Sequence, residues 1–141
     1  MSSDYMVPFV PQTQRMSCWA ASTAMMLGYA RNQSYPESAV LEEFASFGID
    51  GADNEECKQL AAQLNLYVLP DQCNSPGAWD QMLQRGPVMV GSPTHVIVIG
   101  GIKDEESEFA QLKVYDPAYS GEHWGAYQDT ETQYEMNPAH G

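Results

Sequence analysis

The sequence predicts an α+β domain in which an N-terminal helical half packs on a C-terminal antiparallel β-sheet. Residues 17–30 are apolar on nearly every side, which is typical of a helix in the middle of a core. After residue 86 the chain turns to short β-branched runs separated by glycine, proline and an acidic turn. Helices and strands that are segregated along a chain are typical of α+β folds, whose two halves pack on each other. We therefore expect a ligand groove between the halves.

The expected helices follow from their capping and breaking residues. Residues 1–11 precede them as an extended lead-in, because Pro8 and Pro11 disfavour helix. Serine, aspartate or asparagine side chains cap the later starts, and Gly48 and Gly86 stand near two of the ends. The expected helices are 17–30, 34–48, 53–64 and 75–86.

Four β-strands are expected, one between helices and three after the last helix. Leu66–Leu69 is a short apolar run that ends at Pro70. The later runs are rich in valine, isoleucine and leucine, and glycine or acidic turns separate them. The expected strands are 66–69, 87–90, 95–100 and 112–116.

The length and composition indicate one domain that covers residues 1–141. A chain of 141 residues with 43% hydrophobic residues can bury one core but not two. No apolar window reaches the length of a membrane span and no signal peptide is visible, so we expect a soluble protein made in a cytoplasm. The cysteines Cys18, Cys57 and Cys73 show neither a disulfide framework nor metal-ligand spacing, which favours reduced thiols and no metal.

The charge of the chain excludes one class of partner. Its formal net charge is −13, from 19 acidic residues against six lysines and arginines. Nucleic acid phosphates would repel such a chain, since no basic stripe is present to release counterions. The acidic balance either steers the protein towards a basic partner or only confers solubility, and the sequence leaves both open.

One short stretch combines two parts of a catalytic site. Gln12 lies six residues before Cys18, in a Ser-Cys-Trp-Ala run that begins the first expected helix. The thiolate is the reactive form of cysteine, and the free N–H groups at a helix N-terminus favour negative charge. Cys18 is therefore a candidate nucleophile. The side-chain amide of Gln12 and the backbone N–H of Cys18 are candidate donors to an oxyanion.

Two later residues complete the candidate site. His95 opens the apolar run 96–99 and can act as a general base, and Asp116 ends a strand and can orient the imidazole. Each residue has a purely structural alternative: a core cysteine, a core histidine with its bonds satisfied, or a turn-forming aspartate. His123 and His140 are weaker candidates for the base, because they fall in a turn-rich polar tail.

The spacing Gln-x5-Cys-Trp-Ala resembles the active-site region of papain-like cysteine proteases. The strand at His95 and the step Asp116–Pro117 resemble the compact bacterial branch, which includes double-glycine leader peptidases and injected effector proteases. The resemblance covers residues 7–121, but only these three short blocks are sharp, and the cysteine block is the most specific. Papain-type enzymes usually orient their histidine with asparagine, and this chain carries Asp116 instead, as the compact branch does.

The resemblance implies a papain-like fold with a central catalytic helix and an endopeptidase without a cofactor. Cys18, His95 and Asp116 form the implied triad, and Gln12 supplies the amide because Gln14 lacks the six-residue offset. Trp19 packs behind the site and shields the ion pair from water. The substrate-groove candidates are Trp19 and Trp124, although Trp124 packs the last loop in the alternative interpretation.

The implied biological role is that of an interbacterial effector toxin. We expect delivery by a specialised secretion system, cleavage of specific proteins in the cytoplasm of the target cell, and inhibition by a cognate immunity protein. The same residues also suit glutamine deamidation, acyl transfer or cleavage of cell-wall amides. A non-catalytic binding module is the remaining alternative.

Overall fold

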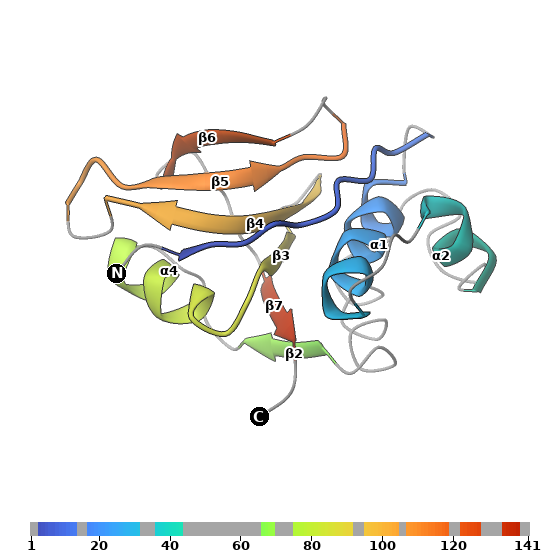
Figure 1. Ribbon diagram of the computed structural model, residues 1–141, viewed down its shortest axis with the longest axis horizontal. Coiled ribbons are helices and arrows are strands. Elements are labelled where there is room, and N and C mark those ends of the chain that lie inside the picture. The colour runs from blue at the N-terminus through green and yellow to red at the C-terminus, as the bar shows by residue number, and fades with distance from the viewer. Residues whose placement is uncertain are drawn as a thin grey trace.

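The computed structural model describes residues 3–13, 17–31, 36–43, 66–69, 75–91, 95–104, 107–118, 122–127 and 134–138. Figure 1 shows the arrangement of the elements. In chain order they are β1 (Ser3–Asp4), α1 (Cys18–Arg31), α2 (Glu37–Glu43), β2 (Leu66–Leu69), α4 (Pro76–Leu83), β3 (Val88–Gly91), β4 (Val96–Lys103), β5 (Gln111–Tyr115), β6 (Glu122–Ala126) and β7 (Tyr134–Pro138). The helix expected over 53–64 lies outside the described residues, as do Cys57 and Cys73. Among the helices that are described, none is long and apolar enough to cross a membrane.

All the described strands belong to one sheet. Its order is β2-β7-β3-β4-β5-β6, and β1 pairs with the C-terminal part of β4. Every pairing is antiparallel. In the view of Figure 1, helices α1 and α2 lie together to the right of the sheet, and α4 lies to the left, below β4. The predicted α+β class, with helices packed on an antiparallel sheet, is confirmed.

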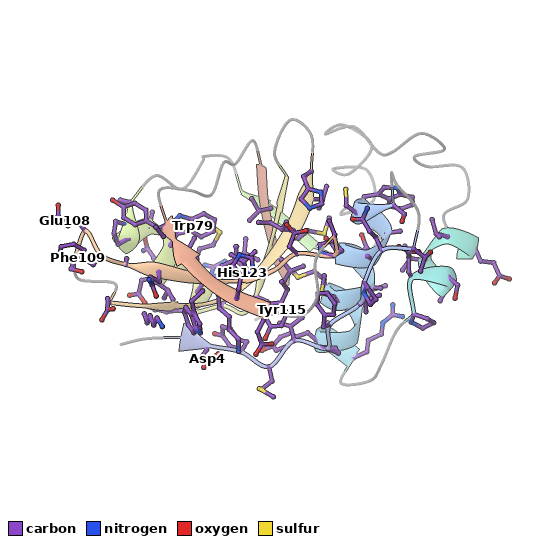
Figure 2. The ribbon with its side chains drawn as sticks, turned by 90° about the horizontal axis from the view of Figure 1, so that it is seen from above. Asp4, Trp79, Glu108, Phe109, Tyr115 and His123 are labelled. Carbon is purple, nitrogen blue, oxygen red and sulfur yellow. The ribbon has the colours of Figure 1, made fainter. Side chains whose placement is uncertain are left out.

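Three of the strands were not predicted from the sequence. β1 lies in the expected lead-in, where Ser3 pairs with Ile102, and β6 and β7 follow the last predicted strand. These segments lack a β-branched run, so neighbouring strands rather than intrinsic propensity determine their conformation. His123, which the sequence places in a turn-rich tail, lies on β6 opposite Val114. Figure 2 shows its ring on that strand.

β4 continues past the glycine pair where the prediction ended it. Its register with β5 shifts between Ile99 and Gly101, which marks an irregularity of the β-bulge type. A Cβ atom on Gly100 would lie 2.4 Å from a ring carbon of Tyr115. Only a glycine fits at position 100, because the Tyr115 ring packs directly on the backbone there. β4 then continues to Lys103.

α1 is buried on every side, as predicted. All ten residues from Trp19 to Gly28 are buried, and the helix contacts β3, β4 and α2. The carbonyl of Ser17 accepts hydrogen bonds from the N–H groups of Ala20 and Ala21 at 3.0 and 3.1 Å, so the first turn closes around Cys18. A helix enclosed by a sheet and a second helix needs an apolar surface all round.

The sheet is covered on both faces. Successive side chains of a strand point to opposite faces, so one strand contributes to two cores. Met89 packs with α1, whereas Val88 and Val90 pack with Trp79 and Leu83 of α4. Ser75 caps α4 by accepting a hydrogen bond from the Ala78 N–H at 3.2 Å, which confirms the predicted start of this helix.

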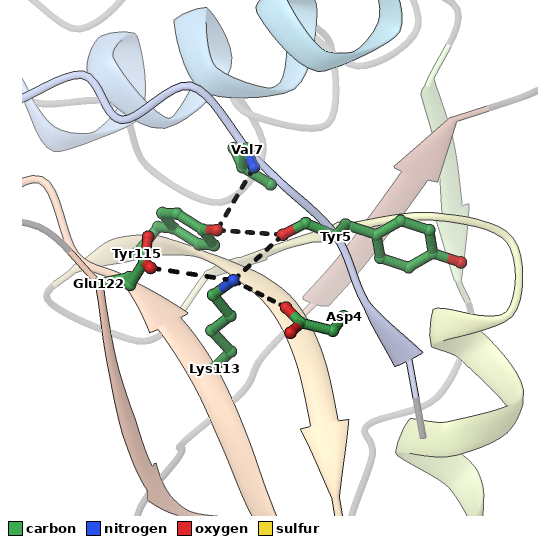
Figure 3. Close-up of polar contacts among 6 residues, drawn as sticks. All are labelled: Asp4, Tyr5, Val7, Lys113, Tyr115 and Glu122. Atoms are coloured by element: carbon green, nitrogen blue, oxygen red, sulfur yellow. Dashed lines mark hydrogen bonds and ion pairs between the residues drawn. The ribbon is translucent and has the colours of Figure 1, made fainter. Parts of the chain in front are cut away.

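The N-terminal segment is fastened to β5 by a polar cluster around the buried side chains of Lys113 and Tyr115 (Figure 3). The Lys113 ammonium contacts the Asp4 carboxylate at 2.7 Å and the carbonyl of Tyr5 at 3.5 Å. The Tyr115 hydroxyl donates to the Tyr5 carbonyl at 3.0 Å and accepts from the Val7 N–H at 3.3 Å. These hydrogen bonds hold residues 4–7 against β5, and the chain continues from there to Gln12.

We expect Tyr115→Phe to lower the free energy of unfolding by about 1–3 kcal/mol, because the buried Val7 N–H loses its acceptor. The ring itself stays in place, so packing is retained. Urea unfolding of the variant measures the change. Glu122→Gln is the control, because its carboxylate is 50% exposed and 3.9 Å from Lys113. Equal stabilities of Tyr115→Phe and wild type would contradict a fastening role for the hydroxyl.

Candidate active site

The antiparallel pairing of β4 and β5 brings His95 and Asp116 to the same end of the sheet. His95 directly precedes β4 and Asp116 directly follows β5, and the register pairs Val98 with Tyr115. The His95 Nε2 atom lies 2.5 Å from the Asp116 Oδ1 atom. The side chains are 28% and 12% exposed, so the pair is largely shielded from solvent.

The N-terminus of α1 meets the same end of the sheet. Ser22 lies one helical turn after Cys18, on the same face of α1. Its buried hydroxyl donates to the Val96 carbonyl at 3.0 Å, which ties that face to the residue after His95. Cys18 lies close enough to the His95 ring to contribute to the raised pKa of that histidine.

The electrostatics of the site favour an imidazolium at neutral pH. The hydrogen bond to Asp116 is the largest cause that raises the pKa of His95, followed by the hydrogen bond to Cys18. Burial opposes both, and the pKa is raised from 6.5 to about 10. A protonated imidazole beside a cysteine sulfur stabilises the thiolate, which is the reactive form of cysteine.

Asp116 stays ionised in this environment. Burial raises the pKa of its carboxyl, but hydrogen bonds from His95 and from the Ala118 N–H outweigh burial, so the pKa is lowered overall. The Ala118 N–H lies 3.0 Å from Oδ1. The charge of His123 on β6 acts in the same direction. This effect of a second histidine was not predicted from the sequence, because β6 was not predicted.

Gln12 lies beside the same end of β5. Its backbone N–H donates to the Pro117 carbonyl at 2.9 Å, so the residue is held next to Asp116. Gln12 is half-buried. The competing Gln14 lies outside the described residues. The structure thus brings Cys18, His95 and Asp116 together, with Gln12 adjacent.

Of the two tryptophans that were predicted to line a groove, Trp19 is buried in the core and Trp124 lies on β6. Trp19 is 1% exposed and packs in the core around α1, so it backs the site from within. Trp124 is on β6, with the Lys103 ammonium 4.4 Å from its ring centroid. The register pairs Trp124 with Lys113, three residues before Asp116. The role of Trp124 as a groove residue stays a prediction.

Sequence reasoning missed Ser22. A serine in an otherwise apolar helix, four residues after the candidate nucleophile, was the available signal. In the part of the chain that the structure describes, no group of three His, Cys, Asp or Glu residues is placed to hold a metal ion.

Comparisons with known proteins identify the family. The model of the family described as papain-like cysteine protease AvrRpt2 matches residues 1–134. A search of curated proteins found no match to the chain.

Solved structures share the fold. The chain is similar to a double glycine motif protease from an AMS/PCAT transporter, solved in complex with the leader peptide. The TM-score is 0.69 at 21% identity, over 96% of this chain and 92% of that chain. It is also similar to the peptidase domain of Streptococcus ComA, a bifunctional ABC transporter involved in a quorum sensing pathway. That TM-score is 0.65 at 18% identity, over 94% and 99% of the two chains.

A third similar structure is UfSP from C. elegans, with a TM-score of 0.67 at 15% identity, over 96% of this chain and 33% of that chain. The papain-like fold is therefore confirmed. Because the family model spans nearly the whole sequence, the chain belongs to the papain-like cysteine protease AvrRpt2 family and is a cysteine peptidase.

Proposed function

We propose that the chain is an endopeptidase that uses Cys18 as nucleophile, His95 as acid and base, and Asp116 as the group that orients the imidazole. The observation that supports this most directly is the position of the His95 ring, which hydrogen-bonds with Asp116 and has its pKa raised by both Asp116 and Cys18. This order of groups is the one that cysteine peptidase chemistry requires.

In the proposed reaction the Cys18 thiolate adds to the carbonyl carbon of the scissile bond. The negative charge that develops on the carbonyl oxygen is bound by the Gln12 side-chain amide and the Cys18 N–H. The imidazolium then gives its proton to the leaving amine as the C–N bond breaks, which leaves a thioester. Water attacks the thioester with the neutral imidazole as base, and the carboxylic acid product and thiol are released.

We expect Gln12→Ala to lower kcat by about 10²–10³-fold, because an oxyanion donor is lost. Alkylation of Cys18 by iodoacetamide forms no oxyanion, so its rate should stay near that of wild type. Gln81→Ala is the matched control, since Gln81 is exposed on α4. Equal losses in hydrolysis and in alkylation would contradict the assignment of Gln12 as an oxyanion donor.

The substrate is proposed to be a protein. One of the similar structures is a double glycine motif protease in complex with the leader peptide, which supports a peptide as ligand. The first experiment is a comparison of new protein N-termini in a bacterial lysate treated with wild type or with Cys18→Ala. New termini that depend on Cys18 would support proteolysis and reveal the cleavage sequence.

The same lysate tests the alternative reactions. If no new termini appear, a mass increase of about 1 Da on specific glutamines would indicate deamidation, since the reaction replaces –NH₂ by –OH. Soluble fragments released from purified cell wall would indicate an amidase. Either result without new termini would reject the endopeptidase proposal and retain the Cys18–His95–Asp116 chemistry.

The biological role is proposed to be that of an interbacterial effector toxin with a cognate immunity protein. The resemblance of the Cys18 and His95 blocks to injected effector proteases supports this role. We expect wild type to slow the growth of cells that express it, and co-expression of the product of the neighbouring gene to restore growth. Cells that tolerate wild type as well as Cys18→Ala, without any partner, would contradict the toxin role.

A further inference from the structure

The segment between Gln12 and Cys18 is tied to α2 by one buried carboxylate. Glu37 is the first residue of α2 and is only 4% exposed. A buried carboxylate is costly unless its oxygens receive hydrogen bonds. The hydrogen-bond donors around the Glu37 carboxylate therefore show which segments of the chain this residue holds together.

Three donor groups converge on Glu37. The Thr13 N–H lies 3.1 Å from Oε2 and 3.3 Å from Oε1, and the Thr13 hydroxyl lies 2.5 Å from Oε1. The Ser17 hydroxyl lies 2.8 Å from Oε2. Hydrogen bonds to an ionised acceptor are stronger than neutral ones. Glu37 thus joins Thr13 to Ser17 through both of its oxygens.

These two residues are the neighbours of the two proposed oxyanion donors. Thr13 follows Gln12, and Ser17 precedes Cys18. The backbone of Gln12 is also anchored on its other side, because its own N–H donates to Pro117 at 2.9 Å. Gln12 is therefore held between two fixed points, one at Pro117 just after β5 and one at Glu37 on α2.

We propose that Glu37 is a positioning residue that sets the Gln12 side chain relative to the Cys18 N–H, an inference that rests on the proposed oxyanion role of Gln12. Donors must lie about 2.7–3.1 Å from the oxyanion. A misplacement of about 1 Å can cost roughly 10²-fold in rate. Two donors from separate segments need a common anchor to meet this tolerance, and the Glu37 carboxylate joins both segments.

Glutamine replaces this group only in part. A carboxylate is an acceptor at both oxygens, whereas an amide presents one oxygen and one NH₂ group. In Glu37→Gln an NH₂ group at the position of Oε2 cannot accept from the Thr13 N–H, and it bonds to Ser17 only when the Ser17 hydroxyl turns to accept. The substitution keeps the size of the side chain, so it disturbs the anchor while altering packing little.

The test compares two reactions of the same cysteine in the full chain. Hydrolysis is measured with a quenched fluorescent peptide that spans a cleavage site recovered from the lysate. Alkylation by iodoacetamide is measured on the Cys18 peptide by mass spectrometry. We expect Glu37→Gln to lower kcat by about 10–100-fold with little change in KM, and to change alkylation by less than about threefold. Glu42→Gln, on the exposed side of α2, should change neither.

A double-mutant cycle shows whether Glu37 acts through Gln12. In the Gln12→Ala background, Glu37→Gln should cost less than about threefold in kcat, because the donor that it positions is absent. The full 10–100-fold loss in both backgrounds would overturn the proposal, as would parallel losses of hydrolysis and alkylation, which indicate general damage. If Glu37→Gln does not fold, Thr13→Val serves in its place, with a loss in kcat of about 3–10-fold and unchanged alkylation.

Failure of the proposed function gives a different result. If wild type and Cys18→Ala both leave every peptide intact, the endopeptidase proposal fails and the role of Glu37 fails with it. If wild type cleaves the peptide and Glu37→Gln cleaves it equally well, only the role of Glu37 is overturned.

Discussion

Cys18→Ala is expected to lower kcat for peptide cleavage by on the order of 10⁴-fold or more, the scale that follows removal of the nucleophile from a catalytic triad. The reason lies in the geometry of Cys18. Cys18 lies close enough to the His95 ring to help raise the pKa of that ring to about 10, so a proton donor is present near the sulfur. No other cysteine lies in the part of the chain that the structure describes.

The variant should fold normally, which makes the loss interpretable. Cys18 is partly exposed at the first position of α1, so truncation to alanine leaves no large cavity. Circular dichroism and the thermal midpoint should match wild type, and Cys18→Ser should show a similarly large loss in kcat. Cleavage by Cys18→Ala at more than about a hundredth of the wild-type rate would exclude Cys18 as the nucleophile.

Asp116→Asn is expected to lower kcat by about 10²–10⁴-fold, since the group that fixes the tautomer of the imidazole is replaced by a neutral one. The carboxylate lies 2.5 Å from Nε2 and is the largest cause of the raised pKa of His95. Without it the pKa of His95 should fall towards its ordinary value of 6.5. The alkaline limb of the pH–rate profile should therefore move from about pH 10 to lower pH.

The same substitution should change how stability depends on pH. His95 titrates at 6.5 in the unfolded chain and at about 10 in the folded protein, so the folded state binds more protons between these values. The resulting stabilisation is fully present below about pH 6.5 and is lost as the pH rises to about 10. We expect urea unfolding to show a large difference between wild type and Asp116→Asn near pH 6.5, and a smaller one near pH 10.

Asp104→Asn is the control for both measurements. Asp104 is exposed in the turn after β4 with φ 57°, a conformation that asparagine also adopts. Asp104→Asn removes one negative charge, as Asp116→Asn does, but at a position far from His95. If Asp104→Asn and Asp116→Asn shift the alkaline limb equally, the effect comes from net charge and not from the hydrogen bond to the imidazole.

The local parts of the fold were predictable because short-range physics determines them. An apolar stretch of helical length predicts α1, and Ser75 predicts the start of α4, because capping depends on adjacent residues. The central strands β3, β4 and β5 were predicted from their β-branched residues. The strands β1, β6 and β7 were not, because long-range pairing holds them.

The candidate site divides in the same way. The sequence by itself determined the residue types, since a glutamine, a cysteine at a helix start, a histidine before a strand and an aspartate after one are visible in the chain. Only the tertiary structure decided that they meet, because the antiparallel register of β4 and β5 brings His95 to Asp116. Likewise, only the tertiary structure decided which groups Ser22 and Glu37 contact. Their partners lie 74 residues away for Ser22 and 20 to 24 residues away for Glu37, and folding alone brings them together.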